Sequence, residues 1–245
     1  MIRLERYSAT GNTFIVVDCT DKTLSDEEKS RIVLENVGDR DGAIFVEMNG
    51  NLYHMDYFNR DGKRATFCGN GARTFVRYLK DFYSLSGEVT FSTNAGILKA
   101  KVSSISDKIS VQMPYPKYKG EIAYDEYKGV LIEVGVPHVV IQVENVDEVE
   151  IEKLAPEIRY RFDANVNFFQ VEKENTLKIR TYERGVERET LSCGSGITST
   201  AYYYKFFVAK NLVVPDKVNI QTKGGELSVI FYNAEVFLEG GVVHG

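Results

Sequence analysis

The chain has 245 residues, of which 43% are apolar and 27% are charged, a balance typical of a globular protein with room for one large domain or two of about 120 residues. No apolar run approaches the roughly 18 residues of a membrane span, and a net charge of −5 with scattered Lys and Arg argues against nucleic acid as a partner. The start, Met1–Glu5, has no charged-then-apolar signal pattern, so we expect a cytoplasmic protein with reduced thiols.

Short strands dominate the first half. Asn49-Gly50 predicts a type I′ hairpin turn, and Ser25-Asp26-Glu27-Glu28 is a capping box that begins a helix reaching about Asn36. Apolar residues after Cys68 recur at the spacing of one helical face and predict a second helix. They are Ala72, Phe75, Val76 and Leu79. The alternating or β-branched runs that predict strands are residues 2–8, 13–18, 43–48, 51–58, 87–93, 96–103 and 108–113.

The second half repeats this arrangement. Pro114-Tyr115-Pro116 ends the first half, because two prolines cannot continue a central strand and suit a short linker. Helices are predicted near residues 148–158 and 195–209, and we expect the aromatic residues of the second one, Tyr202–Phe207, to pack inside the fold. The predicted strands lie near residues 129–134, 138–143, 166–171, 176–182, 217–222, 226–231 and 235–239, the last of which closes back toward the first domain.

Two of the three cysteines begin matching glycine-rich turns. Cys68-Gly69-Asn70-Gly71 and Cys193-Gly194-Ser195-Gly196 each lead into a predicted helix. A helix that begins at Cys-Gly-x-Gly has free backbone N–H groups and the positive end of its dipole at that point, and both stabilise an anion and lower the pKa of a thiol. We therefore expect two reactive thiols and two anion-binding turns.

The two turns belong to a longer internal repeat. Gly11-Asn12-Thr13-Phe14 precedes Cys68 by almost the same number of residues as Gly135-Val136-Pro137-His138 precedes Cys193. Related segments also lie just before each cysteine and at a hairpin after each helix. They are Tyr57–Gly62 and Tyr182–Gly185, then Phe91–Gly96 and Ile220–Gly225. Four landmarks in one order favour two copies of one domain over a chance similarity between two β-rich halves.

We predict an α+β protein of two pseudo-symmetric domains. The first covers residues 1–115 and carries Cys68, and the second covers residues 116–239 and carries Cys193, while residues 240–245 are expected to pack on the first domain. Many short strands must bury two faces and protect their edges. Each domain is therefore expected to be a strongly bent mixed sheet or small barrel around one long helix.

Six motifs, in order along nearly the whole chain, resemble those of the diaminopimelate epimerase family. They are Gly11-Asn12-x-Phe14, Asn59-x-Asp61-Gly62, Cys68-Gly69-Asn70-Gly71-x-Arg73, Gly135-x-Pro137-His138, Asn165-Val166-x-Phe168, and Glu183-Arg184-Gly185 leading to Cys193-Gly194-x-Gly196. The resemblance implies an isomerase without cofactor or metal that converts LL-diaminopimelate to meso-diaminopimelate in lysine and cell-wall precursor biosynthesis. It also implies two similar domains with the active site in the cleft between them.

The chemistry of such an isomerase suits the two thiols. Inversion of an amino-acid stereocentre removes the Cα–H proton on one face and returns a proton on the other, so a thiolate and a thiol must flank the carbon. Cys68 and Cys193 fit these catalytic roles. Backbone N–H groups at Gly69-Asn70 and Gly194-Ser195 can stabilise the negative charge that develops on the substrate.

The resemblance implies further roles. It places His138 beside Cys68 and Glu183 beside Cys193 as catalytic partners. Arg184 is chemically apt for the distal carboxylate of the substrate, because its guanidinium can hold a carboxylate bidentately. The residues that the resemblance places around the non-reacting end of the substrate are Asn12, Asn59, Asn165 and Arg184. Glu183 is expected to bind substrate as well as to assist Cys193.

Three positions depart from the family pattern. Thr13 stands where the family usually has Asp, and Val136 stands where many members have Asn, which weakens the expected grip on the distal group of the substrate. The loop through Val186-Glu187-Arg188 carries one extra residue between Glu183 and Cys193. This loop could shift Glu183.

Each candidate also has a simpler interpretation. Cys19, in an apolar strand, reads as an inert buried thiol. His138 alone would suit a satisfied core histidine, and Glu183 with Arg184 an ordinary surface pair. The asparagines are common turn formers, an objection that applies most to the one before Arg60-Asp61-Gly62. The three in question are Asn12, Asn59 and Asn165.

Other functional classes fit less well. Three Cys and three His without a Cys-x-x-Cys pair do not suit zinc. The Gly-x-Gly pairs lack the third glycine of a dinucleotide site and the lysine of a phosphate-binding loop. A non-enzymatic substrate-binding relative would lose one thiol. A racemase of another amino acid, for example lysine or histidine, remains the alternative, and the sequence leaves a homodimer open.

Overall fold

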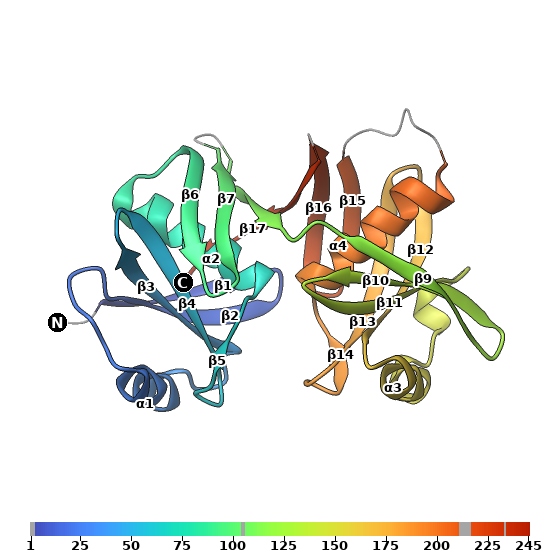
Figure 1. Cartoon of the computed structure of the whole chain (residues 1–245), viewed down its shortest axis with the longest axis horizontal. Helices are drawn as coiled ribbons and strands as arrows, with labels where there is room; N and C mark the ends of the chain where they lie inside the picture. Colours follow the sequence, from blue (N-terminus) through green and yellow to red (C-terminus); the bar gives the residue numbers. More distant parts are fainter. Residues whose placement is uncertain (1–2, 104–105, 211–216, 233) are drawn as a thin grey trace. The chain divides into compact units, whose positions relative to one another are not determined.

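The computed structural model describes residues 3–103, 106–210, 217–232 and 234–245, so Ile2 of the first predicted strand lies outside the described residues. The chain forms two compact units (Figure 1). Unit 1 comprises Met1–Gln112 and Glu239–Gly245, and unit 2 comprises Met113–Leu238.

Unit 1 contains a mixed sheet and two helices. Its elements are β1 (Arg3–Ala9), β2 (Asn12–Asp18), α1 (Asp26–Asn36), β3 (Gly42–Asn49), β4 (Leu52–Asn59), β5 (Arg64–Ala65), α2 (Gly69–Tyr83), β6 (Gly87–Thr93), β7 (Gly96–Val102), β8 (Lys108–Met113) and, from the end of the chain, β18 (Val243–His244).

Unit 2 repeats the order of these elements. They are β9 (Lys117–Tyr124), β10 (Tyr127–Val134), β11 (Val136–Gln142), the 3₁₀ turn η1 (Val146–Glu148), α3 (Ile151–Phe162), β12 (Asn165–Lys173), β13 (Thr176–Glu183), β14 (Arg188–Thr190), α4 (Gly194–Tyr203), η2 (Tyr204–Val208), β15 (Lys217–Thr222), β16 (Gly225–Tyr232) and β17 (Glu235–Gly241), which runs on into unit 1.

The strand pairings of the two units match. The pairs β1–β2 and β10–β11 are antiparallel, and β2–β3 and β11–β12 are parallel. The pairs β3–β4 and β12–β13 are antiparallel, and β4–β6 and β13–β15 are parallel. The α+β class and the internal repeat predicted from the sequence are therefore confirmed.

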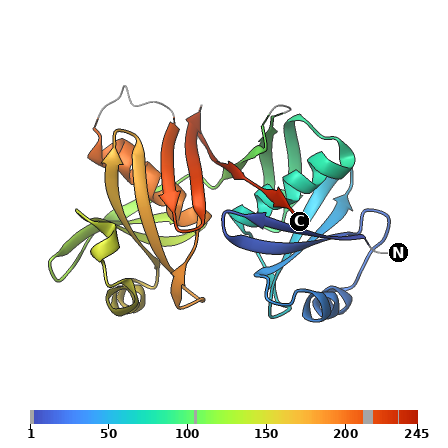
Figure 2. The ribbon, with the colours of Figure 1, turned by 180° about the vertical axis from the view of Figure 1, so that it is seen from behind.

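The end of the chain completes the sheet of unit 1. Strand β18 pairs with β1, just as β9 pairs with β10 in unit 2 (Figure 2). The ring of His244 stacks on Tyr7 with 4.5 Å between centroids, and Arg77 Nη1 donates to the carbonyl of Val242 at 2.9 Å. Residues 239–245 are thus held on unit 1 by sheet pairing, ring stacking and a side-chain hydrogen bond.

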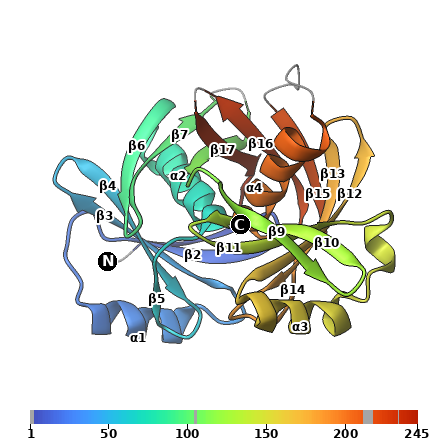
Figure 3. The ribbon, with the colours of Figure 1, turned by 45° about the vertical axis from the view of Figure 1, so that its right-hand side comes forward.

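Helices cover both faces of the central parallel strands. Ile15 and Val17 of β2 pack with Val33 of α1, while the alternate residues Phe14 and Val16 are buried on the face toward α2. In unit 2, β11 likewise packs Val139 and Ile141 against α3 (Figure 3). Such two-sided burial explains the continuous apolar runs in these strands.

The central helices α2 and α4 each contact several strands of their own unit. Helix α2 packs on β1, β2, β3, β4 and β7, and α4 packs on β10, β11, β12, β13 and β16. Within the described part of the chain, no helix combines the length and the apolar content needed for a passage through a membrane. The fold thus surrounds one helix with strands in each unit.

Several predicted elements are confirmed with local corrections. The capping box at Ser25 is formed, with both of its reciprocal hydrogen bonds. The β3–β4 hairpin is present, but its central residues are Gly50 and Asn51, and only Gly50 has positive φ. That geometry matches a type II′ turn, so the predicted type I′ turn was wrong.

The predictions for unit 2 erred in several places, and the short strand β14 was not foreseen. Strand β9 was missed because the exposed Lys117, Lys119 and Glu121 of this edge strand hide its alternation. Helix α3 begins three residues later than predicted and continues beyond Pro156. The predicted helix to residue 209 is α-helical only to Tyr203 and then becomes a π-helical turn.

The aromatic residues at the end of α4 and in η2 pack only partly as predicted, because Tyr204 is buried but Phe206 is exposed. Phe207 stacks on Tyr118 of β9 at 4.9 Å between centroids, and Phe206 contacts Phe231 of β16 edge to face.

We predict that Gly42→Ala destabilises the protein by about 1–3 kcal/mol. A Cβ at Gly42 would lie 2.5 Å from the Phe58 carbonyl oxygen and 2.7 Å from the Tyr57 ring, so the strand pair would have to shift. Gly241→Ala is the matched control, because nothing lies within 4 Å of its added Cβ. Urea unfolding followed by circular dichroism measures both, and equal midpoints for the two variants would contradict the packing of β3 on β4.

Candidate active site

Cys68 is the N-cap residue of α2. Its backbone is extended, with φ −142° and ψ 117°, and its Sγ accepts a hydrogen bond from the backbone N–H of Gly71 at 3.4 Å. The sulfur therefore lies at the positive end of the helix, where a thiolate is stabilised. Gly71 fits because an added Cβ would lie only 3.3 Å from Cys68 Cβ.

A buried cation lies on the same helix. Arg73 is 0% exposed, and its Nη2 donates to Thr10 Oγ1 at 2.7 Å, while Nε and Nη1 have no hydrogen-bond partner among the described residues. Burial lowers the pKa of Arg73 to about 10, and the charge of Cys68 acts in the opposite direction. The guanidinium is still charged at neutral pH, and it favours the thiolate of Cys68.

The predicted binding residues of unit 1 are linked around Asp41. Asn70 Nδ2 donates to Asn12 Oδ1, and Asn12 Nδ2 lies 3.4 Å from Asp41 Oδ2. The same carboxylate oxygen accepts the backbone N–H of Thr13 at 2.8 Å. Although Thr13 replaces the usual Asp, a carboxylate is still present beside Asn12.

Asn59 closes a turn at the end of β4. Its backbone N–H donates to Lys63 O at 2.9 Å, and its carbonyl accepts the N–H of Gly62 at 3.0 Å. Its side chain is exposed. These bonds give Asn59 a turn-forming role, and its predicted contact with substrate stays a prediction.

Cys193 is the N-cap residue of α4, and its surroundings differ from those of Cys68. Cys193 Sγ lies 3.6 Å from Ser195 Oγ, which in turn lies 2.9 Å from His138 Nε2. The other ring nitrogen, Nδ1, lies 3.1 Å from Asn167 Nδ2. The structure thus brings His138 and Ser195 together with Cys193, and the predicted pairing of His138 with Cys68 stays a prediction.

His138 is fully buried. Burial lowers its pKa to about 3, and the positive charge of Arg184 acts in the same direction. His138 is therefore neutral at physiological pH, so it acts as a hydrogen-bonding group rather than as a charged partner of a thiolate.

Asn165 and Arg184 are joined at the end of β13. Asn165 Oδ1 accepts the backbone N–H of Arg184 at 2.9 Å, and Asn165 Nδ2 donates to Pro137 O at 3.1 Å. Arg184 Nη1 donates to Asp163 Oδ2 and Asp163 O, both at 3.0 Å. The guanidinium is about one-third exposed and already has one carboxylate partner.

Glu183 ends β13 and keeps its pairing with Arg188 of β14. The extra residue of the loop is accommodated in a tight turn, in which the N–H groups of Val186 and Glu187 donate to the Glu183 carbonyl at 3.2 and 2.8 Å. Gly185 and Glu187 both have positive φ. The insertion therefore leaves the strand pairing at Glu183 intact.

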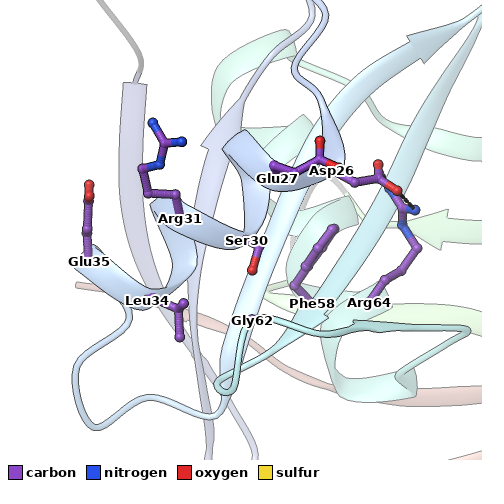
Figure 4. A pocket seen from close by; sticks show the side chains of 9 residues that line it. All are labelled: Asp26, Glu27, Ser30, Arg31, Leu34, Glu35, Phe58, Gly62 and Arg64. Carbon is purple, nitrogen blue, oxygen red and sulfur yellow. Dashed lines mark hydrogen bonds and ion pairs between the residues drawn. The ribbon is translucent and has the colours of Figure 1, made fainter.

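Two surface hollows have none of the predicted site residues in their lining, although the first lies beside the turn that Asn59 closes. One of about 740 Å³ lies between α1 and the β4–β5 turn, and its charged residues include the ion pair of Arg64 with Asp26 (Figure 4). Its lining residues are Asp26, Glu27, Ser30, Arg31, Leu34, Glu35, Phe58, Gly62 and Arg64. The other, of about 850 Å³, lies beside β10 and η1. Neither contains a cysteine.

The three cysteines are free thiols. Burial raises the pKa of Cys19 to about 11, so this thiol is protonated at neutral pH, as its inert interpretation requires. Among the described residues, no three His, Cys, Asp or Glu side chains gather as a metal site would need.

Sequence reasoning missed four residues that the structure connects, directly or through one neighbour, to the candidate site residues. Arg73 lies inside the motif Cys68-Gly69-Asn70-Gly71-x-Arg73, so the motif could have revealed it. Asn167 lies two residues after Asn165 and on the same face of β12, so the strand alternation could have revealed it. Thr181 and Asp41 carried no such signal.

We predict that His138 makes the protein less stable toward acid. Its folded pKa of about 3 lies below the unfolded value of 6.5, so the unfolded chain binds the proton first and stability is lost as pH falls from about 6.5 toward 3. Between pH 7 and pH 5 this loss is on the order of 2 kcal/mol. Urea unfolding at both pH values should show a correspondingly smaller change in His138→Gln, and an unchanged pH dependence would contradict the buried neutral imidazole.

Comparisons with known proteins cover nearly the whole chain. The family model for diaminopimelate epimerase matches residues 6–119 and again residues 130–244. The diaminopimelate epimerase of Thermotoga maritima is 48% identical over 96% of this chain and 97% of its own, and that of Aquifex aeolicus is 37% identical over 97% and 93%.

Solved structures share the fold at low identity. A phenazine biosynthesis protein of the PhzF family from Bacillus anthracis superposes with a TM-score of 0.81 at 18% identity, over 99% of this chain and 96% of its own. A hydroxyproline epimerase from Agrobacterium vitis gives 0.70 at 14% identity, over 100% and 90%. Since the family model covers both halves and the relatives match over nearly their full length, this chain belongs to the diaminopimelate epimerase family.

Proposed function

We propose that the protein interconverts LL-diaminopimelate and meso-diaminopimelate, the reaction of lysine biosynthesis that its family name describes. The observation that carries this proposal is the pair of cysteines at matched helix N-termini, Cys68 on α2 and Cys193 on α4. Two further observations support the proposal. Both cysteines stand in motifs that match those of the family, and the chain is 48% identical to the Thermotoga maritima enzyme.

The two halves of the chain supply one thiol each. We propose that residues 1–115 and 116–239 act as the two epimerase halves and that the substrate binds in the cleft between them. The two compact units and the double match of the family model support this division. Neither thiol could invert a stereocentre alone, because each reaches one face of the carbon.

The reaction needs one thiolate and one thiol, whichever stereoisomer enters. In one direction, one sulfur removes the proton from Cα while the other donates its proton to the opposite face, and in the reverse direction the roles exchange. Cys68 has the Gly71 N–H and the Arg73 cation nearby, and Cys193 has the Ser195 hydroxyl. Both surroundings favour a negative sulfur, so either cysteine is suited to act as the base.

The carbanion also requires stabilisation at the reacting carboxylate. The N-terminal turns Gly69-Asn70 and Gly194-Ser195 offer backbone N–H groups at the positive ends of two helices. The two sulfurs supply both proton-transferring groups, and the helix termini supply the electrostatic stabilisation. The proposed reaction therefore needs no cofactor.

The distal end of the substrate is assigned to residues that already form hydrogen bonds. Asn12 and Asn70 bond to each other, and Asn165 fixes the backbone of Arg184. Arg184 is the cationic member, and its present partner Asp163 is 75% exposed in its side chain. A substrate carboxylate can replace this solvent-exposed partner at modest cost, since an exposed ion pair contributes about 0–1 kcal/mol.

We predict that catalysis in deuterated water labels the product first. Because the donating thiol carries solvent deuterium, early turnover of either stereoisomer should give labelled product and nearly unlabelled recovered substrate. Cys68→Ser and Cys193→Ser should each lower kcat on the order of 10²–10⁴-fold, the usual effect of losing a general acid–base group. Cys19→Ser is the control and should leave rate and labelling unchanged. Equal early labelling of substrate and product would instead indicate a single base.

We predict that Arg184→Met weakens selection for a distal carboxylate. Loss of a charged hydrogen bond costs about 1.5–3 kcal/mol, so kcat/KM for LL-diaminopimelate should fall roughly 10- to 150-fold while activity on lysine changes little. Arg31→Met, at an exposed arginine of α1, is the matched control. If the parent enzyme prefers lysine or histidine, the protein is a racemase of another amino acid. If Arg184→Met lowers kcat/KM for LL-diaminopimelate no more than for lysine, Arg184 does not hold the distal carboxylate.

A further inference from the structure

A chain of buried polar side chains connects β13 to the N-terminal turn of α4. Thr181 Oγ1 donates to Asn167 Oδ1 at 2.9 Å. Asn167 Nδ2 faces Val139 O at 3.0 Å and His138 Nδ1 at 3.1 Å. His138 Nε2 lies 2.9 Å from Ser195 Oγ, and Ser195 Oγ lies 3.6 Å from Cys193 Sγ.

The partners of Asn167 determine which way its amide points. The carbonyl of Val139 can only accept, so it must face the amide nitrogen. The amide oxygen then faces Thr181, whose hydroxyl donates to it and helps to hold this orientation. Asn167 therefore presents an N–H group to His138.

The orientation of this amide determines where the proton of His138 lies. Asn167 Nδ2 can only donate, so Nδ1 of the neutral imidazole accepts and its proton is on Nε2. The Nε2–H group then donates to Ser195 Oγ. Since that oxygen lone pair is occupied, the hydroxyl hydrogen of Ser195 is free to point at Cys193 Sγ.

We propose that Thr181, Asn167 and His138 form a positioning relay that turns the hydroxyl hydrogen of Ser195 toward Cys193 and so favours the thiolate of Cys193. The relay rests on the proposed function only in treating Cys193 as a catalytic thiol. His138 acts here through Ser195, which differs from its expected role beside Cys68.

The strand register places the relay residues side by side. His138, Asn167 and Thr181 come from the adjacent strands β11, β12 and β13, where Asn167 pairs directly with Thr181. They are 0%, 0% and 3% exposed. Directed hydrogen bonds are stronger in such a dry environment than in water.

Gly196 allows α4 to approach the relay. A Cβ at this position would overlap with Asn167 Oδ1 and would lie 3.4 Å from His138 Cε1. The second glycine of the Cys-Gly-x-Gly turn is thus required by the relay itself.

The repeated positions in unit 1 carry no such relay. Phe14 occupies the place of His138 in the repeat, and the matching register leads to Ile44 on β3 and Tyr57 on β4. Phe14 and Ile44 are fully buried and apolar, and neither can pass on a hydrogen bond. The relay therefore belongs to Cys193 alone, whereas Cys68 has the Gly71 N–H and the Arg73 cation.

Few charged groups face the relay. Helix α4 itself carries none, and β11 carries none besides His138. Arg184, which follows β13, lowers the pKa of His138. Glu183, at the end of β13, is the other titratable residue at this end of the strand. The other charged side chains of the strands packed on α4 are exposed or paired outside the relay. They are Lys128, Glu133, Glu172, Lys173, Lys178, Arg180 and Glu226.

The test measures the ionisation of Cys193 rather than turnover. In a Cys68→Ser background, iodoacetamide labelling of Cys193 is followed against pH by peptide mass mapping, and Cys19 stays silent because its pKa is about 11. Thr181→Val removes the hydroxyl that donates to the Asn167 amide oxygen while keeping the side-chain shape. We expect it to slow labelling at neutral pH roughly tenfold and to move the labelling profile to higher pH.

Two control variants separate the relay from general packing. Thr181→Ser keeps the hydroxyl and should restore the parent profile. Thr200→Val removes another buried hydroxyl, one that donates to Gly196 O at 2.8 Å within α4, and should leave the profile unchanged. If Thr181→Val labels like the parent, or if Thr200→Val shifts the profile equally, the relay is wrong.

The tautomer of His138 can be read without any substitution. ¹⁵N NMR of the imidazole in the parent protein should show a protonated Nε2 and a bare Nδ1 between pH 5 and pH 8 on the present assignment. A proton on Nδ1 would overturn the proposal. Both readouts are independent of epimerase activity, so a failed deuterium experiment would leave them interpretable.

Discussion

Burial of the central strands on both faces is the constraint from which the site follows. Because β2 and β3 lie between α1 and α2, and β11 and β12 are covered in the same way, alternate residues of one strand face two different helices. Helices α2 and α4 pack directly on these strands. Strand side chains that face either helix can therefore lie next to its first turn. In each unit, one face of three strands therefore packs directly against the helix that begins at a cysteine.

The two units use this common frame differently. In unit 1 the relevant strand face is apolar, and Cys68 depends on its own helix, through the Gly71 N–H and the buried Arg73. In unit 2 the same face is polar, and support for Cys193 comes from the sheet through His138 and Ser195. A reversible epimerase must ionise either sulfur, and the structure offers two independent ways of stabilising the charge.

The sequence was sufficient for the features that depend on local pattern. Cys68 and Cys193 could be identified because glycine spacing at a helix start is a local signal, and the repeat followed from matched landmarks. Edge strand β9 escaped because its exposed lysines remove the apolar alternation.

The contacts of His138 also escaped, for a different reason. Asn167 reaches His138 through the parallel pairing of β11 with β12, and Thr181 reaches Asn167 through the antiparallel pairing of β12 with β13. No local sequence pattern encodes this register. The Val139 carbonyl of β11 then sets the orientation of the Asn167 amide, and a hydroxyl from a third strand helps to hold it. Such a directed network becomes visible only when the strands are placed side by side.

The position of β18 has a consequence for how the protein is made. Residues 239–245 complete the sheet edge at β1, yet they leave the ribosome after all of unit 2. During synthesis unit 1 therefore waits with the edge of β1 uncovered and the Tyr7 ring without its stacked partner. Unit 2 is built from the contiguous residues 113–238, whereas unit 1 can complete its native sheet only when the last residues of the chain have been made.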